Sequence, residues 1–368
     1  MTAPSPFSTT LFDPAIEVER AVSELRYGRP VLLRDQDKTL AVLALDAVQP
    51  KIYDAFAGVT GEDHHLMLTA RRAARLGLKA KSDVLVPLAG IDFDQASRLS
   101  YALDVEAPKR WTPASTLASE SVELAHVSLL LPAMVVADVT GRQSAFSACC
   151  SLHAAALTDY RPARGNFQKV VRTRVPLEDY GNADFVVFRG GVAQKDQVAI
   201  IVGKPDVSKP VPIRIHSSCI TGDLCGSLKC DCGDQLRNGL DLLQQAGGGV
   251  LLYLDQEGRG TGIGAKMRAY GYQHLGLDTI DADAELGFAE DHRRYEAAIA
   301  MLKLLDIAEV IVFTNNPTKI ESLRQAGIKV HQRTPVLGRV TRENENYLRT
   351  KTLRAGHMMD LETLIAAE

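Results

Sequence analysis

The chain has 368 residues, 46% of them apolar and 24% charged, and its formal net charge is −3. These values are typical of a globular protein with room for two domains, and they argue against a basic nucleic-acid-binding surface. No run of about 18 or more apolar residues occurs, so we expect no membrane span, and no secretory signal is evident at the N-terminus. Six cysteines, most of them clustered, fit the reducing cytoplasm rather than a disulfide framework.

The N-terminal half predicts a domain over residues 1–165. From Ile16 the apolar residues recur with the spacing of one helix face, and Gly28 ends that helix before a strand at 30–33. The stretch that follows mixes strands with alanine-rich helices, for example at 84–88 and 70–76.

Two features lie near the end of this half. Cys149 and Cys150 are adjacent in an apolar, Ala/Ser-rich stretch, and we interpret them as small core residues. The basic, irregular stretch from about 160 to 175 is interpreted as a linker between the domains.

Strand and helix signals alternate through the second half and predict a domain over residues 175–368. Apolar runs at 185–188 and 197–202 are expected to form paired strands. Further strands are expected at 213–215, 250–254, 310–313 and 328–330, with helices at 236–243, 265–275, 295–305 and 317–326. This alternation is typical of an α/β or α+β fold with crossover helices.

The strongest chemical signal is a cysteine triplet. Cys219, Cys230 and Cys232 have the spacing C-x10-C-x-C, which suits Zn²⁺ bound by three thiolates with the fourth corner open for water. A zinc with an open position lowers the pKa of its water to about 7, so the triplet predicts metal-assisted hydrolysis. His216 or Cys225 could instead complete a closed, structural site, and that alternative stays open.

A glycine-rich loop at 256–264 lies between a predicted strand and a predicted helix. Its glycines allow close approach of the backbone to a ligand, although such a loop is often only a turn. Glu257 and Arg259 favour a binding role, because a carboxylate can accept N–H groups from a nucleobase and a guanidinium can bind an anion.

Three further places carry polar candidates. Asp291 and Arg293 open a predicted helix, where on the residues alone the ordinary interpretation is a solvated helix end. Thr314 and Lys319 follow a predicted strand, a natural ligand-binding position in α/β folds. Arg214, next to the cysteine run, is a candidate phosphate contact.

Taken together, these motifs resemble GTP cyclohydrolase II over roughly residues 175–358. The resemblance is carried by the segments 216–223, 227–235, 256–259, 268–270 and 314–317. It implies a mixed sheet with crossover helices. It also implies hydrolytic opening of the imidazole ring of GTP with release of formate and pyrophosphate, the first step of riboflavin biosynthesis. The product would be 2,5-diamino-6-ribosylamino-4(3H)-pyrimidinone 5′-phosphate.

The resemblance also implies roles for single residues. It assigns one Zn²⁺ per subunit to Cys219, Cys230 and Cys232, and it assigns substrate contacts to Arg214, Gln235, Glu257, Arg259, Thr314 and Lys319. Tyr270 is expected to take part in ring opening. Asp291 and Arg293 are expected to act in pyrophosphate release, which replaces the helix-end interpretation. The resemblance further implies Mg²⁺ with the triphosphate, and a cytoplasmic homodimer.

One departure from the family pattern bears on the substrate. The family usually has an aliphatic residue where this chain has Thr261, and related proteins act in uracil degradation. A uracil nucleotide such as UTP is therefore the alternative substrate. From another class, a non-catalytic nucleotide sensor is the second alternative.

The N-terminal half resembles 3,4-dihydroxy-2-butanone 4-phosphate synthase more weakly, through segments 18–28 and 68–77. That enzyme's acidic metal-binding loop should follow Leu33, but this chain offers only Asp35 and Asp37 there. Because Mg²⁺ needs several oxygen ligands, we expect this domain to be non-catalytic and to serve as a scaffold, a dimerisation surface or a regulator.

Overall fold

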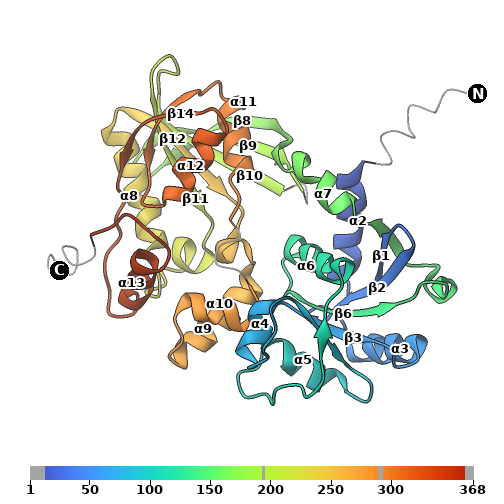
Figure 1. Ribbon diagram of the computed structural model, residues 1–368. Coiled ribbons are helices and arrows are strands. Elements are labelled where there is room, and N and C mark those ends of the chain that lie inside the picture. The colour runs from blue at the N-terminus through green and yellow to red at the C-terminus, as the bar shows by residue number, and fades with distance from the viewer. Residues whose placement is uncertain (1–12, 193–194, 289–292, 361–368) are drawn as a thin grey trace, which may run out of the picture. The chain divides into compact units, whose positions relative to one another are not determined.

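The computed structural model describes residues 13–192, 195–288 and 293–360, and its contacts divide the chain into two compact units (Figure 1). Unit 1 comprises residues 1–163 and 261–290, and unit 2 comprises residues 164–260 and 291–368. Among the described residues, no helix combines the length and apolar character needed to cross a bilayer.

Unit 1 is built on a seven-stranded sheet in the order β5-β4-β3-β6-β2-β1-β7. Its strands are β1 Val31–Asp35, β2 Lys38–Ala44, β3 His65–Leu68, β4 Val84–Pro87, β5 Thr112–Pro113, β6 Ala133–Asp138 and β7 Cys150–His153. Its helices are α2 Pro14–Arg26, α3 Pro50–Thr60, α4 Ala70–Arg75, α5 Phe93–Tyr101, α6 Thr116–Ser128, α7 Ala156–Asp159, α9 Ile263–His274 and α10 Thr279–Glu285.

The first helix shows why the local pattern was predictive. Asp13 accepts a hydrogen bond from the Ala15 N–H and Pro14 occupies the first turn, so two independent signals mark the start of the helix. Gly28 follows the helix with φ +68°, and a Cβ there would lie 2.7 Å from the carbonyl oxygen of Ala47. The helix predicted from Ile16 to Gly28 is therefore confirmed.

The two adjacent cysteines depart from their predicted place. Cys149 and Cys150 are both half-buried, and Cys149 packs against the edge of the main apolar core of unit 1. They are not core residues, because β7 is the last strand of its sheet and one side of it lacks a neighbour.

Unit 2 is a second seven-stranded sheet in the order β14-β13-β11-β12-β10-β9-β8. Its strands are β8 Phe167–Leu177, β9 Gly181–Gly190, β10 Lys195–Gly203, β11 Val211–Ser217, β12 Gly248–Leu254, β13 Glu309–Phe313 and β14 Lys329–Thr334. Its helices are α8 Cys232–Gln245, α11 Glu296–Leu304, α12 Pro317–Gln325 and α13 Glu345–Leu353, with short turns η3 Ile220–Leu224 and η4 Glu257–Gly260.

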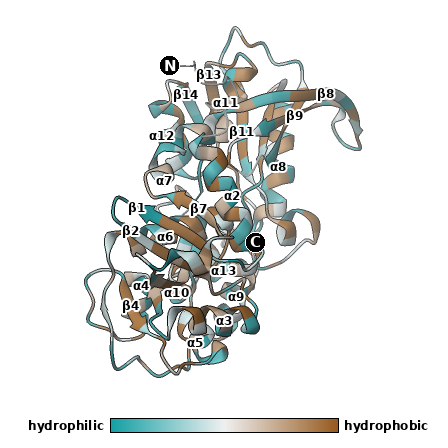
Figure 2. Ribbon diagram, turned by 90° about the vertical axis from the view of Figure 1, so that its right-hand side faces the viewer, coloured by the Kyte–Doolittle hydropathy of each residue, from teal (hydrophilic) through white to brown (hydrophobic). Residues whose placement is uncertain are grey.

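This second sheet is mixed, as predicted. Strands β8, β9, β10 and β12 pair antiparallel, whereas β12, β11, β13 and β14 pair parallel. The apolar strand residues form the core of the unit, and in Figure 2 brown, hydrophobic stretches lie on the strands while connecting loops are largely teal. The carboxyl ends of the parallel strands β11, β12 and β13 point to the same edge, where α/β folds place their ligands.

The boundary between the two units falls at 163/164, inside the linker predicted at 160–175, but most of that stretch is not a linker. Residues 167–177 form β8, which pairs antiparallel with β9 at the end of the sheet. Because β8 is an edge strand with exposed residues along most of its length, it lacks apolar alternation and carries several basic side chains. Its sequence therefore resembled a linker.

The two units also differ from two consecutive domains. Residues 261–290, which we placed in the second domain, belong by their contacts to unit 1. Ala269 of α9 and Phe288 pack in one apolar cluster with Leu131. Arg72 of α4 adds an ion pair of 2.8 Å to Glu285 of α10. Local periodicity carries no information about such long-range partners.

Candidate metal and nucleotide site

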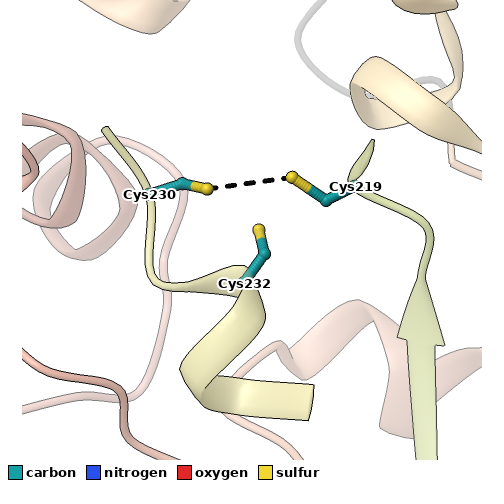
Figure 3. Close-up of side chains that lie close together, drawn as sticks. All are labelled: Cys219, Cys230 and Cys232. Atoms are coloured by element: carbon teal, nitrogen blue, oxygen red, sulfur yellow. Dashed lines mark hydrogen bonds between the residues drawn. The ribbon is translucent and has the colours of Figure 1, made fainter. Parts of the chain in front are cut away.

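The cysteine triplet converges. Cys219 follows β11, Cys230 precedes α8, and Cys232 is the first residue of α8. The three sulfurs lie within 4.8 Å of one another and point toward one centre (Figure 3). Among the residues that the structure describes, this is the only such group of three or more potential metal ligands.

The spacing of the sulfurs fits a tetrahedral metal ion. Zn²⁺ bonds thiolate sulfur at about 2.3 Å, which makes the sulfur–sulfur edge of a tetrahedron about 3.8 Å. The Sγ atoms of Cys219 and Cys230 are 3.7 Å apart. The hydrogen bond to Cys219 and burial raise the pKa of Cys230 to about 11, and a divalent cation would reverse this preference for the neutral thiol.

Asp223 holds the loop that carries the first cysteine. Its carboxylate accepts the Cys219 N–H at 3.0 Å and the Tyr253 hydroxyl at 2.9 Å, and it lies 3.1 Å from Nε2 of His216. The His216 ring is buried and stacks on Tyr253 with ring centroids 5.6 Å apart. Burial lowers the pKa of His216, so the ring is neutral near pH 7.

Neither open candidate for a fourth ligand belongs to the cysteine group. His216 directs Nε2 to Asp223, and Cys225 is exposed in the loop between the ligands. Neither residue is among the groups that lie within 4.8 Å of one another. The arrangement of the described residues favours three protein ligands and an open position.

Gly222 is the residue that lets the loop close over the sulfurs. A Cβ at this position would lie 2.9 Å from Sγ of Cys230 and 3.1 Å from Sγ of Cys219. The Gly222 N–H instead donates to Cys219 Sγ at 3.4 Å. No larger residue fits here without moving a ligand.

The glycine-rich loop contacts the cysteine loop directly. One carboxylate oxygen of Glu257 accepts the Ile220 N–H at 2.7 Å, and the other accepts the Gly258 N–H at 2.9 Å. Arg259 adopts φ +60°, the left-handed region that non-glycine residues rarely occupy. Strained backbone of this kind is concentrated at functional sites, so the turn-only interpretation loses support.

A buried polar chain runs behind the cysteines. Arg214 donates to the Phe313 carbonyl at 3.0 Å and to Oε1 of Gln235 at 2.8 Å. Gln235 in turn donates to Asp231 at 2.5 Å, and Lys351 lies 2.9 Å from the same carboxylate. Only 3% of Arg214 is exposed, and burial lowers its pKa to about 10.

The loop after β13 is also polar and buried. Lys319 of α12 donates to the Ile215 carbonyl at 2.7 Å, which brings its ammonium group beside β11. The hydroxyl of Thr314 accepts the Asn316 N–H at 3.0 Å, and Asn316 caps α12 by accepting the Thr318 N–H. Thr314 and Lys319 therefore lie at the carboxyl edge of the parallel strands, as predicted.

The remaining predicted site residues, Asp291, Arg293 and Tyr270, do not all lie in the described part of unit 2. Asp291 lies outside the described residues, whereas Arg293 is described just before α11. Tyr270 lies on α9 in unit 1, half-buried, with the Lys266 ammonium 5.6 Å from its ring centroid.

Sequence reasoning missed several residues that shape the site. Asp223 and Gly222 lie within the segment that carries the family resemblance, so the motif could have indicated them. Asp231 and Lys351 are 120 residues apart, and only folding reveals their contact.

The fold and the site define a mixed α/β protein whose three converging cysteines could hold a metal ion. A family model described as GTP cyclohydrolase II matches residues 168–335. A GTP cyclohydrolase-2 of Xylella fastidiosa (strain 9a5c) is 52% identical, covering 99% of this chain and 92% of its own length. One of Azospirillum brasilense is 36% identical and covers 93% of each chain. The chain therefore belongs to the GTP cyclohydrolase II family.

One solved structure aligns with most of the chain at low similarity. A two-domain 3,4-dihydroxy-2-butanone 4-phosphate synthase from A. baumannii aligns with 87% of this chain and 99% of its own. The TM-score is 0.33 and the identity 14%, so this match carries no argument about the fold of either unit.

Proposed function

We propose that this enzyme hydrolyses GTP, opening the imidazole ring and releasing formate and pyrophosphate, as the first step of riboflavin biosynthesis. The observation that carries the proposal is the convergence of three cysteine sulfurs in a loop that Glu257 contacts through the Ile220 N–H. Opening a purine ring by water needs a water activated near the bound base, and the contact between Glu257 and the cysteine loop supports that arrangement.

Zn²⁺ held by Cys219, Cys230 and Cys232 would supply a Lewis acid that activates water. The chain's own contribution is to hold the three thiols in place. Asp223 fixes the backbone of Cys219, and Gly222 leaves the space that the sulfurs need. The fit of the sulfur spacing to a tetrahedral edge supports this assignment.

Glu257, Arg259 and Gln235 are proposed to hold the nucleotide. Both oxygens of Glu257 accept backbone N–H groups, which orients the carboxylate, and a carboxylate can accept the N–H donors of a nucleobase. Tyr270 is proposed to stabilise charge during ring opening through its phenol. This role comes from the family resemblance.

The substrate's phosphates and ribose are proposed to be bound by Thr314 and Lys319. Pyrophosphate release is proposed to depend on Asp291 and Arg293. Arg214 is reassigned from direct phosphate contact to a supporting role, because its buried guanidinium already donates to Phe313 and Gln235. Loss of pyrophosphate needs cationic charge on the triphosphate, for which Mg²⁺ is the proposed partner.

Unit 1 is proposed to be non-catalytic. The expected acidic loop would lie between β1 and β2. These strands remain paired as far as Asp35 and Lys38, so the turn between them has only two residues, Gln36 and Asp37. A two-residue turn offers too few oxygens for a Mg²⁺ site. We further propose that the enzyme is a homodimer of the cytoplasm, which sedimentation and cell fractionation would test.

The decisive experiment measures formate release from GTP and from UTP by the purified full-length protein. We expect formate from GTP, and absence of formate from GTP would overturn the proposal. Formate or ring opening from UTP alone would favour the pyrimidine nucleotide, and binding without turnover of either would favour a sensor.

Two variants separate the metal from the phosphate chemistry. Cys230→Ser should abolish zinc content and turnover together, whereas Arg293→Ala should keep zinc and halt turnover. Cys150→Ser, at a half-buried thiol outside the triplet, is the matched control and should change neither. A Cys230→Ser protein with full turnover would refute the metal assignment.

A further inference from the structure

The chain beyond β14 folds back onto the cysteine loop. We call residues 337–351 the clasp; all of it lies beyond residue 335, where the match to the family model ends. The clasp bonds to residues on both sides of the second and third cysteines. Its contacts are Leu337 O with Asn238 Nδ2 at 2.7 Å, Arg339 Nε with Asp234 at 3.1 Å, and Thr341 Oγ1 with Leu228 O at 3.0 Å.

The end of the clasp contacts the residue between two ligands. Asp231 separates Cys230 from Cys232, and only 2% of it is exposed. It is the N-cap residue of α8, yet its carboxylate makes no capping hydrogen bond to the helix. The carboxylate instead lies 2.9 Å from Nζ of Lys351 and accepts from Gln235 at 2.5 Å. An aspartate normally accepts N–H groups of the first turn at this position, whereas this one is held by the side chains of Lys351 and Gln235.

The fit around this carboxylate is close. A Cβ on Gly338 would lie 2.8 Å from the Cβ of Asp231, so the backbone of the clasp packs directly on the aspartate. The Lys351 ammonium that pairs with Asp231 lies 4.4 Å from the ring centroid of Tyr347. Asp231 therefore has little freedom to move, and the cysteines bonded to it on either side share that restraint.

The charges require a cation here. Three thiolates and a divalent ion carry a net charge of −1, and a buried carboxylate between two of the ligands would add another. Like charges at close range in a buried site repel strongly, whereas Lys351 offsets the added charge.

We propose that Lys351 is a positioning residue for the metal site: it neutralises and fixes Asp231, and thereby holds Cys230 and Cys232 at the separation that the ion needs. This inference rests on the metal site of the proposed function, but metal binding can be measured without substrate.

The test titrates the metal-free full-length protein with Co²⁺ alone, following the thiolate–cobalt absorption bands and competing with a chelator. Lys351→Met should weaken Co²⁺ binding by about ten- to a hundredfold, the usual range for partners of metal ligands, and Lys351→Arg by about threefold or less. Lys329→Met is the matched control, because Lys329 is exposed and pairs with Glu309 between β13 and β14. It should leave affinity unchanged.

A double-mutant cycle separates positioning from general support of the fold. In an Asp231→Asn background, Lys351→Met should change affinity by less than about twofold, because the charge that Lys351 offsets is gone. Should Lys351→Met lose its fold by circular dichroism, Lys351→Gln, which can still donate to Asp231, replaces it in the same cycle. Wild-type affinity and bands in folded Lys351→Met would overturn the inference and leave the metal site standing. A wild-type protein without thiolate–cobalt bands would overturn both.

Discussion

At the scale of single residues, the cysteine loop depends on side chains that do not touch the proposed ion. The Asp223 carboxylate forms hydrogen bonds with the Cys219 N–H, the Tyr253 hydroxyl and the His216 ring. Buried polar groups held by several partners have one preferred arrangement, so the first ligand is oriented before any metal binds. Such preorganisation is what a catalytic site with an open position requires.

Gly222→Ala tests this preorganisation without removing a ligand. The added methyl group would lie under 3.0 Å from the sulfur of Cys230, so a ligand or the loop must shift. We expect metal affinity to fall by about tenfold or more and turnover to fall with it. Chelator competition and zinc content measure the first effect, and formate release measures the second.

Gly58→Ala provides the control for this substitution. Gly58 lies within α3, has an ordinary backbone conformation, and a Cβ there would meet no atom within 4 Å. It should raise stability by about 0.5–1 kcal/mol and leave metal affinity unchanged. Wild-type metal affinity in Gly222→Ala would show that the loop accommodates the methyl group without displacing a ligand, and would contradict the proposed preorganisation.

At the scale of elements, the segment 261–290 is joined to unit 1 by a buried guanidinium. Arg72 of α4 donates to the carbonyls of Leu99 and Ala102 and forms an ion pair with Glu285 of α10. Each of its three nitrogens therefore has an acceptor, which is the condition under which a buried charge is tolerated. Tyr272 of α9 adds a hydrogen bond to the Tyr101 carbonyl.

Arg72→Met should destabilise unit 1 by about 3–5 kcal/mol, because it leaves the mostly buried Glu285 carboxylate and two carbonyls without their donor. The single tryptophan, Trp111, packs against the core of this unit, so its fluorescence during urea unfolding reports the change.

Arg29→Met is the matched control for the Arg72 substitution. Arg29 pairs with Glu24 on the surface of the same unit, and exposed pairs contribute about 1 kcal/mol or less. Equal losses from the two substitutions would contradict a special role for the buried pair.

At the scale of the whole molecule, each unit has a hydrophobic core of its own. The larger core of unit 1 lies between β2, β3, β4 and β6 and their helices, and that of unit 2 lies on β9 to β13 with α11. The three cysteines all belong to unit 2. Metal binding should therefore stabilise that unit selectively, because a ligand stabilises only the folded unit that binds it.

Metal removal is the corresponding experiment. A chelator should lower the thermal midpoint of unit 2, with about 4 kcal/mol lost where the metal had been present at a thousand times its dissociation constant. The transition detected by Trp111 should not move. Calorimetry measures both transitions, and an equal shift of both midpoints would mean that the two units unfold as one.

Much of the fold followed from local patterns. Capping residues and apolar periodicity identified α2, and the alternation of apolar runs identified β9, β10, β12 and β13. Patterns failed where burial was incomplete. The edge strand β8 has too few buried residues to show alternation, and Cys149 and Cys150 lie beside an uncovered sheet edge.

The sequence by itself determined the ligand triplet, the polar loops after the strands and the family, because each is encoded by residue types at short spacing. Only the tertiary structure decided that His216 hydrogen-bonds to Asp223, that residues 261–290 pack with unit 1, and that Lys351 pairs with Asp231. Those contacts join residues that are distant in the chain or surrounded by ordinary neighbours. Their free energy comes from burial and charge compensation that exist only once the chain has folded.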